Sequence, residues 1–163
     1  TFLAFPLGGL LAVLELGPIR DPLAAAVSGA LVGCTLGLMQ WWALRPIGIS
    51  FDWVWSTGVA LMIGSPMAWV LLSFSTTIPS LTIWGLIAGA IVGLGQSLSQ
   101  RNSLKKAASW TALVSGSWGL AWLISANVIV DADANYAVFG STGAIVPTLI
   151  LSFFLNPLLA KKK

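Results

Sequence analysis

The chain has 163 residues, of which 57% are apolar and only 8% are charged. Roughly a quarter of the residues in a soluble globular domain are charged, so this composition excludes such a domain and predicts an integral membrane protein. The formal net charge of +3 does not indicate nucleic-acid binding, because the basic residues lie at the ends of apolar segments and form no patch. We therefore predict an all-α transmembrane helix bundle, a single domain over residues 1–163.

Charged and turn-forming residues divide the chain into six apolar segments, most of which approach the ~20 residues that cross a bilayer. The first is the shortest, and because the sequence begins with Thr1 and not with Met, an incomplete first segment is one expectation. Pro22 and Pro79 suit the first turns of helices, where the missing N–H would have no acceptor. Short connections predict antiparallel neighbouring helices. The expected spans are 1–17, 22–44, 51–74, 79–99, 107–130 and 136–159.

The basic residues predict how the bundle is oriented in the membrane. Seven of the eight Lys and Arg residues fall on one side of a six-span arrangement, and only Arg20 falls on the other. Basic residues concentrate in cytoplasmic loops, so we expect both termini in the cytoplasm or on the equivalent side of an internal membrane. The opposite side carries Asp21, Asp131 and Asp133. The seven basic residues are Arg45, Arg101, Lys105, Lys106, Lys161, Lys162 and Lys163.

The nine tryptophans indicate two further roles. Those at segment ends on the basic side are expected to anchor the bundle, because amphipathic indole rings favour the membrane–water interface. Those expected deeper in the bundle are candidates for contact with another helix or with a planar ligand. The expected interface anchors are Trp41, Trp42, Trp53, Trp55 and Trp110 together with Arg45 and Arg101, and the deeper tryptophans are Trp69, Trp118 and Trp122.

A ladder of glycines four residues apart occurs twice in the chain. The stretch GALVGCTLGLMQWWALR at 29–45 aligns without gaps with GLIAGAIVGLGQSLSQR at 85–101, an offset of 56. Both copies lie on even-numbered spans and run in the same direction. This predicts a parallel repeat of two helical hairpins, 22–74 and 79–130, and not the inverted repeat of many transporters. The matched pairs are Gly29 with Gly85, Gly33 with Gly89, Gly37 with Gly93, Gln40 with Gln96, Arg45 with Arg101 and, at an offset of 57, Trp53 with Trp110.

The ladders have two interpretations. Glycines at this spacing line one helix face and let a neighbour approach closely, which matters in lipid because little hydrophobic force acts between helices. The glutamine after each ladder can donate and accept hydrogen bonds at its end. Internal packing of the bundle is one interpretation, and a groove that docks a partner subunit, a lipid or a pigment is the other. A weaker ladder without the glutamine follows at Gly140, Ala144 and Thr148.

The first copy contains the pattern G-x-x-x-G-x-x-Q-W-x-x-L-R, at Gly33, Gly37, Gln40, Trp41, Leu44 and Arg45. This pattern resembles one that recurs in small polytopic membrane proteins of bacteria, and notably of cyanobacteria. The second copy departs from it, with Ser97 and Gln100 in place of the Trp and the Leu. The resemblance implies a bacterial inner membrane or a thylakoid membrane, and it brings no catalytic residues to carry over.

The sequence holds little of the chemistry that catalysis needs. It has no histidine and one cysteine, Cys34, which removes the commonest general base and the commonest metal ligands. The ionisable side chains inside the expected spans, Glu15 and Asp52, lie near span ends, where interfacial hydration is the favoured interpretation. We therefore predict neither an enzyme nor a metal site.

Three classes of function remain. A non-catalytic accessory or scaffold subunit of a membrane complex, photosynthetic if the membrane is thylakoid, requires only the features present and is favoured. A small-solute channel or transporter is the alternative, although broken helices and charged pore rings are missing. A membrane enzyme acting on lipid lacks acid–base residues. The expected partners are membrane lipids and other transmembrane subunits. Candidate ligands are chlorophyll, carotenoid or bound lipid, and without histidine the magnesium of chlorophyll would need Gln40, Gln96, Asn127, a backbone carbonyl or water.

Overall fold

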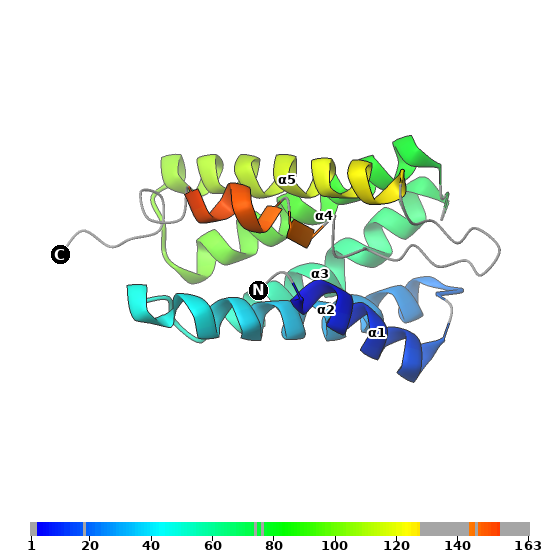
Figure 1. Ribbon diagram of the computed structural model, residues 1–163, viewed down its shortest axis with the longest axis horizontal. Helices are drawn as coiled ribbons and strands as arrows, with labels where there is room; N and C mark the ends of the chain where they lie inside the picture. The colour runs from blue at the N-terminus through cyan, green and yellow to red at the C-terminus, as the bar shows by residue number, and fades with distance from the viewer. Residues whose placement is uncertain are drawn as a thin grey trace.

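The part of the chain that the computed structural model describes is all-helical (Figure 1), as the composition predicts. This part comprises residues 3–17, 19–73, 75, 77–127, 144–145 and 147–153. The helices are α1 (Ala4–Leu16), α2 (Pro22–Leu44), the short 3-10 helix η1 (Arg45–Ile47), α3 (Asp52–Leu72), α4 (Ile78–Ser99) and α5 (Leu104–Ala126), and residues 144–145 and 147–153 are also helical.

Three of the described helical segments are long and apolar enough to cross a membrane, namely α2 together with η1, α3 and α4. The six expected spans are therefore confirmed only in part. α1 has 13 residues and extends roughly 20 Å at 1.5 Å per residue, which is short of the ~30 Å hydrocarbon core. α5 has 23 residues, but a lysine pair at its start and several serines make it less apolar. The sixth expected span, 136–159, lies mostly outside the described residues.

The predicted helix starts at the two prolines are confirmed. Pro22 is the first residue of α2, and the Asp21 side chain caps this helix by accepting a hydrogen bond from Ala24 N at 2.8 Å. Pro79 lies in the first turn of α4. Proline suits this place because its φ angle is already helical and the first turn does not need its N–H. After α2, Gly48 adopts a φ of +87°, a left-handed conformation that glycine reaches without strain.

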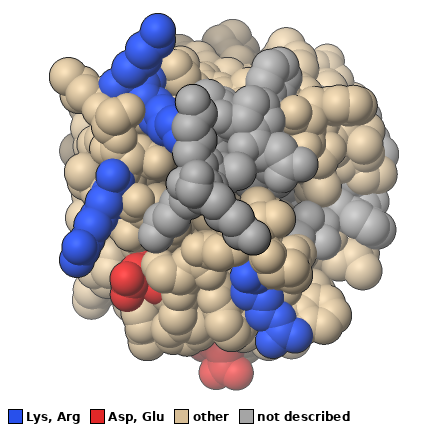
Figure 2. Space-filling view, turned by 90° about the vertical axis from the view of Figure 1, so that its left-hand side faces the viewer, with Lys and Arg blue, Asp and Glu red and all other residues tan. Residues whose placement is uncertain are grey.

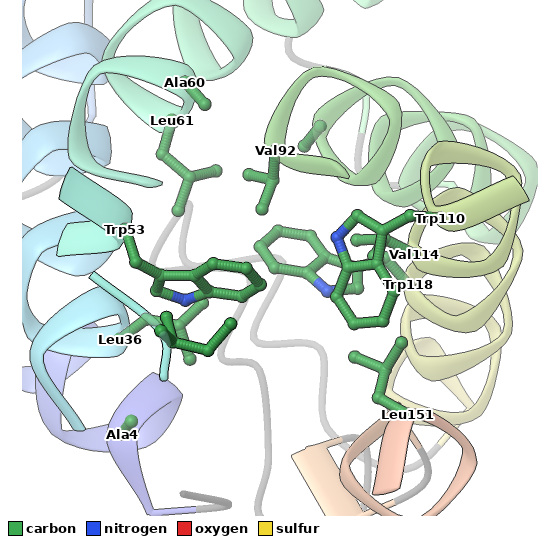
Figure 3. Packing of buried hydrophobic residues seen from close by; sticks show 12 residues of the cluster. Ala4, Leu36, Trp53, Ala60, Leu61, Val92, Trp110, Val114, Trp118 and Leu151 are labelled. Atoms are coloured by element: carbon green, nitrogen blue, oxygen red, sulfur yellow. The ribbon is translucent and has the colours of Figure 1, made fainter. Parts of the chain in front are cut away.

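The long helices form two antiparallel hairpins, α2 with α3 and α4 with α5 (Figure 1). Contacts between α3 and α4 join the hairpins, and α1 packs along α2. Gly95 lets the two hairpins approach closely, since a Cβ there would lie 3.1 Å from Ser56 O. The buried core occupies the space between the hairpins, with the rings of Trp53 and Trp110 near its centre (Figure 3).

The glycine ladders make the contacts inside each hairpin. A Cβ atom on Gly33 would lie 2.7 Å from Thr57 O, and one on Gly89 would lie 2.8 Å from the Trp118 Cβ. Real Cβ atoms essentially never come this close, so α3 and α5 can reach these positions only because no side chain stands there. The ladder thus replaces side-chain interdigitation by direct backbone approach.

These contacts repeat with the sequence. Gly33 meets Leu61, and its counterpart Gly89 meets Trp118, which lies 57 positions after Leu61. The other ladder positions follow the same rule, so the two hairpins are built alike at their inner surfaces. Gly29 and Gly85 face Leu61 and Trp118, and Gly37 and Gly93 face Val54 and Thr111.

We expect Gly33→Leu and Gly89→Leu to destabilise the bundle, because each side chain would overlap the backbone or the first side-chain atom of the facing helix. Overpacking a close contact costs about 1–3 kcal/mol, so thermal unfolding in detergent should give a lower Tm for both variants. Gly9→Leu is the matched control, since nothing lies within 4 Å of its Cβ position. Ladder variants that unfold at the wild-type Tm would contradict this account of the hairpins.

Candidate functional site

A buried network of hydrogen bonds lies where the two hairpins meet. Gln96 on α4 donates through Nε2 to Gln40 Oε1 on α2, at 3.1 Å. The same nitrogen donates to Thr57 Oγ1 on α3, also at 3.1 Å, and Gln96 is 2% exposed. The two glutamines that end the ladders therefore bind one hairpin to the other.

Each glutamine also accepts a hydrogen bond from a tryptophan of its own hairpin. Trp53 Nε1 donates to Gln40 Oε1 at 2.9 Å, and Trp110 Nε1 donates to Gln96 Oε1 at 3.1 Å. The two indole rings lie 6.0 Å apart, tilted by 56°, in the space between the hairpins in Figure 3. The Gln–Trp pairs occupy equivalent positions of the repeat, so one structural motif occurs twice and its two copies meet.

The prediction that Trp53 and Trp110 anchor the bundle at the membrane surface is wrong. The two side chains are 1% and 2% exposed. A buried indole needs an acceptor for its N–H, and the repeated glutamine supplies one inside the bundle. A usable signal was present in the sequence, because the Gln-to-Trp spacing is nearly the same in both copies, 13 and 14 residues.

The other expected anchors lie at the surface of one end of the bundle, where Lys and Arg side chains surround the end face in Figure 2. Trp42 and Trp55 are 63% and 61% exposed. The Arg45 guanidinium lies 5.9 Å and 5.8 Å from the ring centroids of Trp41 and Trp42, within range of a cation–π interaction. Arg101 is exposed. Their insertion into a membrane interface stays a prediction.

The deeper tryptophans contact rings of the same chain. Trp122 stacks on Trp84, with centroids 5.7 Å apart and planes 8° from parallel. Trp118 meets Phe5 edge-on at 5.2 Å, and Trp69 is partly buried. The surfaces proposed for a planar ligand are thus partly occupied by neighbouring rings, although Trp118 also borders a cavity.

The ladders hold helices of this chain. α3 lies against the first ladder and α5 against the second, so of the two interpretations the structure supports internal packing. No groove is open to a partner subunit, lipid or pigment at these glycines. Of the weaker ladder, Gly140 lies outside the described residues, and Ala144 and Thr148 are helical.

A cavity of about 220 Å³ borders the hydrogen-bond network. Gln40 lines it beside both network tryptophans, and α1 closes one side through Phe5. The helical residues 144–145 and 147–153 contribute another wall, which includes Leu151. The cavity is therefore largely apolar and aromatic, with one amide at its edge.

Ionisable groups lie away from this interior. Glu15 is exposed in the last turn of α1, and Asp52 is exposed at the start of α3, where Ser50 Oγ donates to it at 3.4 Å. Among the described residues no group of three or more His, Cys, Asp or Glu side chains could hold a metal ion. Asn127, a candidate axial ligand, donates to Leu123 O of its own helix at 2.7 Å.

Comparison of the chain with protein-family models, with curated proteins and with solved structures finds no match.

We expect Gln96→Leu to destabilise the bundle more than Gln40→Leu, because Gln96 takes part in three hydrogen bonds and Gln40 in two. Membrane hydrogen bonds average ~0.6 kcal/mol and reach about 1.7, so losses of roughly 1–3 kcal/mol are expected from unfolding measurements. Gln100→Leu is the control, since the hydrogen bond from Gln100 to Ser50 is exposed. If both Gln96→Leu and Gln40→Leu were as stable as the wild type, the hydrogen-bond network would not be what holds the two hairpins together.

Proposed function

We propose that the protein is a non-catalytic accessory or scaffold subunit of a membrane complex. The observation that carries this proposal is a stripe of small, exposed residues on the outer face of α5, formed by Ala108, Ala112 and Gly116. Nothing lies within 4 Å of the Cβ position on Gly116. The spacing equals that of the two ladders that hold helices within this chain, and small residues at this spacing are typical of helix–helix contacts in membranes.

The first hairpin has no such stripe. Fifty-seven positions earlier, the equivalent residues are Phe51, which directly precedes α3, and Trp55 and Val59 on the outer face of α3. They are 44%, 61% and 47% exposed. Bulky apolar side chains suit contact with lipid, whereas small ones allow the backbone of another helix to approach. The hairpins match at their inner surfaces and differ here, so the outer face of α5 is the place that favours a partner helix.

The interior of the described bundle also supports a structural role. Neutral side chains line the space between the hairpins, with Trp53, Trp110 and Val92 among the most buried. A channel or transporter, the alternative, would need a polar path between the two sides. The buried glutamines form hydrogen bonds with neighbouring side chains and so contribute to the bundle's own cohesion.

Ala112→Leu and Gly116→Leu should release the partner without unfolding the protein, because each would place a bulky group on an exposed face. After mild solubilisation, native gels and mass spectrometry of co-purified subunits should show a smaller complex and an unchanged Tm. Val59→Leu on α3 is the matched control at the equivalent position of the first hairpin. Photosystem subunits among the lost proteins would support the photosynthetic assignment.

A wild-type protein that purifies alone, or variants that keep the whole complex, would contradict the accessory role. Solute flux in liposomes containing the purified protein would favour the channel or transporter instead.

We also propose a bacterial inner or thylakoid membrane, with both termini on the cytoplasmic side. The basic residues at one end of the bundle support this orientation. The resemblance of the ladder pattern to one in small bacterial membrane proteins supports the choice of membrane. Arg45, Arg101, Lys105 and Lys106 lie at the connections α2–α3 and α4–α5, and Arg20 and Asp21 lie at the connection α1–α2. Lys161, Lys162, Lys163, Asp131 and Asp133 lie outside the described residues.

Single cysteines should report this orientation in a Cys34→Ser background. A membrane-impermeant maleimide applied to intact cells should label Thr77→Cys, between α3 and α4, and leave Ser103→Cys, between α4 and α5, unlabelled until the membrane is opened. Thr77 and Ser103 are both exposed, so a difference in labelling would reflect the side of the membrane and not burial within the protein. The reverse labelling pattern would overturn the orientation.

A further inference from the structure

Gln40 carries a polar group that the network does not use. Its Oε1 accepts hydrogen bonds from both Trp53 Nε1 and Gln96 Nε2, which fixes the orientation of the amide. Its Nε2 must then point away from those two donors, and it forms no hydrogen bond with the described residues. Gln96 Nε2, by contrast, donates to both Gln40 Oε1 and Thr57 Oγ1.

The cavity is the space that remains for this nitrogen, because Gln40 is part of its lining. Thr148 and Ser152 also line the cavity, but their hydroxyls already donate to Ala144 O and Leu149 O at 2.8 Å and 2.7 Å. The donors of the lining that remain are therefore the Gln40 amide and the Trp118 indole N–H. The amide shares the lining with the rings of Phe5, Trp53 and Trp110.

We propose that this cavity binds the end ring of a lipid-soluble molecule, with a ring carbonyl accepting a hydrogen bond from Gln40 Nε2. An apolar cavity of about 150 Å³ holds benzene, so about 220 Å³ suits one substituted ring and is too small for the macrocycle of chlorophyll. Aromatic walls favour a planar ring, and the free Gln40 amide favours a carbonyl on that ring. This proposal needs the membrane location but not the accessory role.

The remainder of such a molecule has a way out of the bundle. Ala43 borders the cavity and is exposed, so the cavity reaches the surface of α2. An apolar tail can leave there and lie along the lipid-facing helices. Isoprenoid quinones and carotenoids with a keto end ring share this chemistry, a ring carbonyl on a long apolar tail.

Three small probes test the recognition. 2,3-Dimethyl-1,4-benzoquinone and isophorone each present a carbonyl on one ring, and 1,2,4-trimethylbenzene has a similar size without an acceptor. Thermal shifts of the purified protein in detergent should give affinities about tenfold higher for the two carbonyl compounds than for the hydrocarbon, the effect of one hydrogen bond. Gln40→Leu should remove this preference and still bind all three.

Two further variants keep the test decisive. Thr57→Val disturbs the network and leaves the Gln40 amide in place, so the preference for the carbonyl compounds should persist. Leu36→Trp should fill the cavity and abolish binding of all three probes, since Leu36 lies in its lining. Equal affinities for the three probes in the wild type, a preference that survives Gln40→Leu, or unchanged binding in Leu36→Trp would each overturn the proposal.

The natural ligand is identified from an organic extract of the protein purified from its own membrane. An ultraviolet absorption that changes on borohydride reduction indicates a quinone, and visible carotenoid bands that move to shorter wavelength on the same reduction indicate a keto carotenoid. Either result, at near-stoichiometric amounts in the wild type and reduced in Leu36→Trp, supports the proposal. An extract that contains only acyl lipid or detergent overturns it, whatever the α5 variants show.

Discussion

The hydrogen bond from Gln96 to Gln40 governs how the two hairpins meet, because lipid offers neither side chain an alternative partner. Three further polar side chains, those of Thr57, Trp53 and Trp110, join this pair. Each of them would incur a free-energy penalty in hydrocarbon if it were left without a hydrogen bond. Rotation or sliding of one hairpin would separate the indole N–H groups from their acceptors. The glycine ladders allow each hairpin to close, and the glutamines then fix the relative position of the hairpins.

The properties that bear on function arise where the two halves of the repeat differ. Their inner contacts correspond position by position, and these contacts account for the shared architecture. Thr57 of the first half accepts a hydrogen bond from Gln96, whereas its equivalent in the second half, Val114, has no acceptor in its side chain. The amide nitrogen of Gln40 has no acceptor among the described residues. On the outer surface, α5 presents small residues where α3 presents bulky ones.

Local signals in the sequence predicted much of the architecture. Pro22 marks the start of α2 correctly, and the expected span 22–44 coincides with Pro22–Leu44. The identity of the helix on each ladder was not predictable, because a glycine face specifies close approach but not which helix approaches. The burial of Trp53 was missed because the anchoring rule considers a residue's depth in the membrane and not the direction of its side chain around the helix.

The two hairpins are built alike at their inner surfaces, and their fusion into one chain has a consequence for symmetry. A dimer of identical hairpins would carry the same residue at both equivalent positions. The two glutamines of such a dimer would have identical partners, so neither could differ from the other in the N–H groups that it leaves free. In a single chain the partners can differ: Gln96 Nε2 donates to two acceptors, and Gln40 Nε2 has none among the described residues. Joining the halves therefore allows a bundle with two similar halves to offer one unique ligand site.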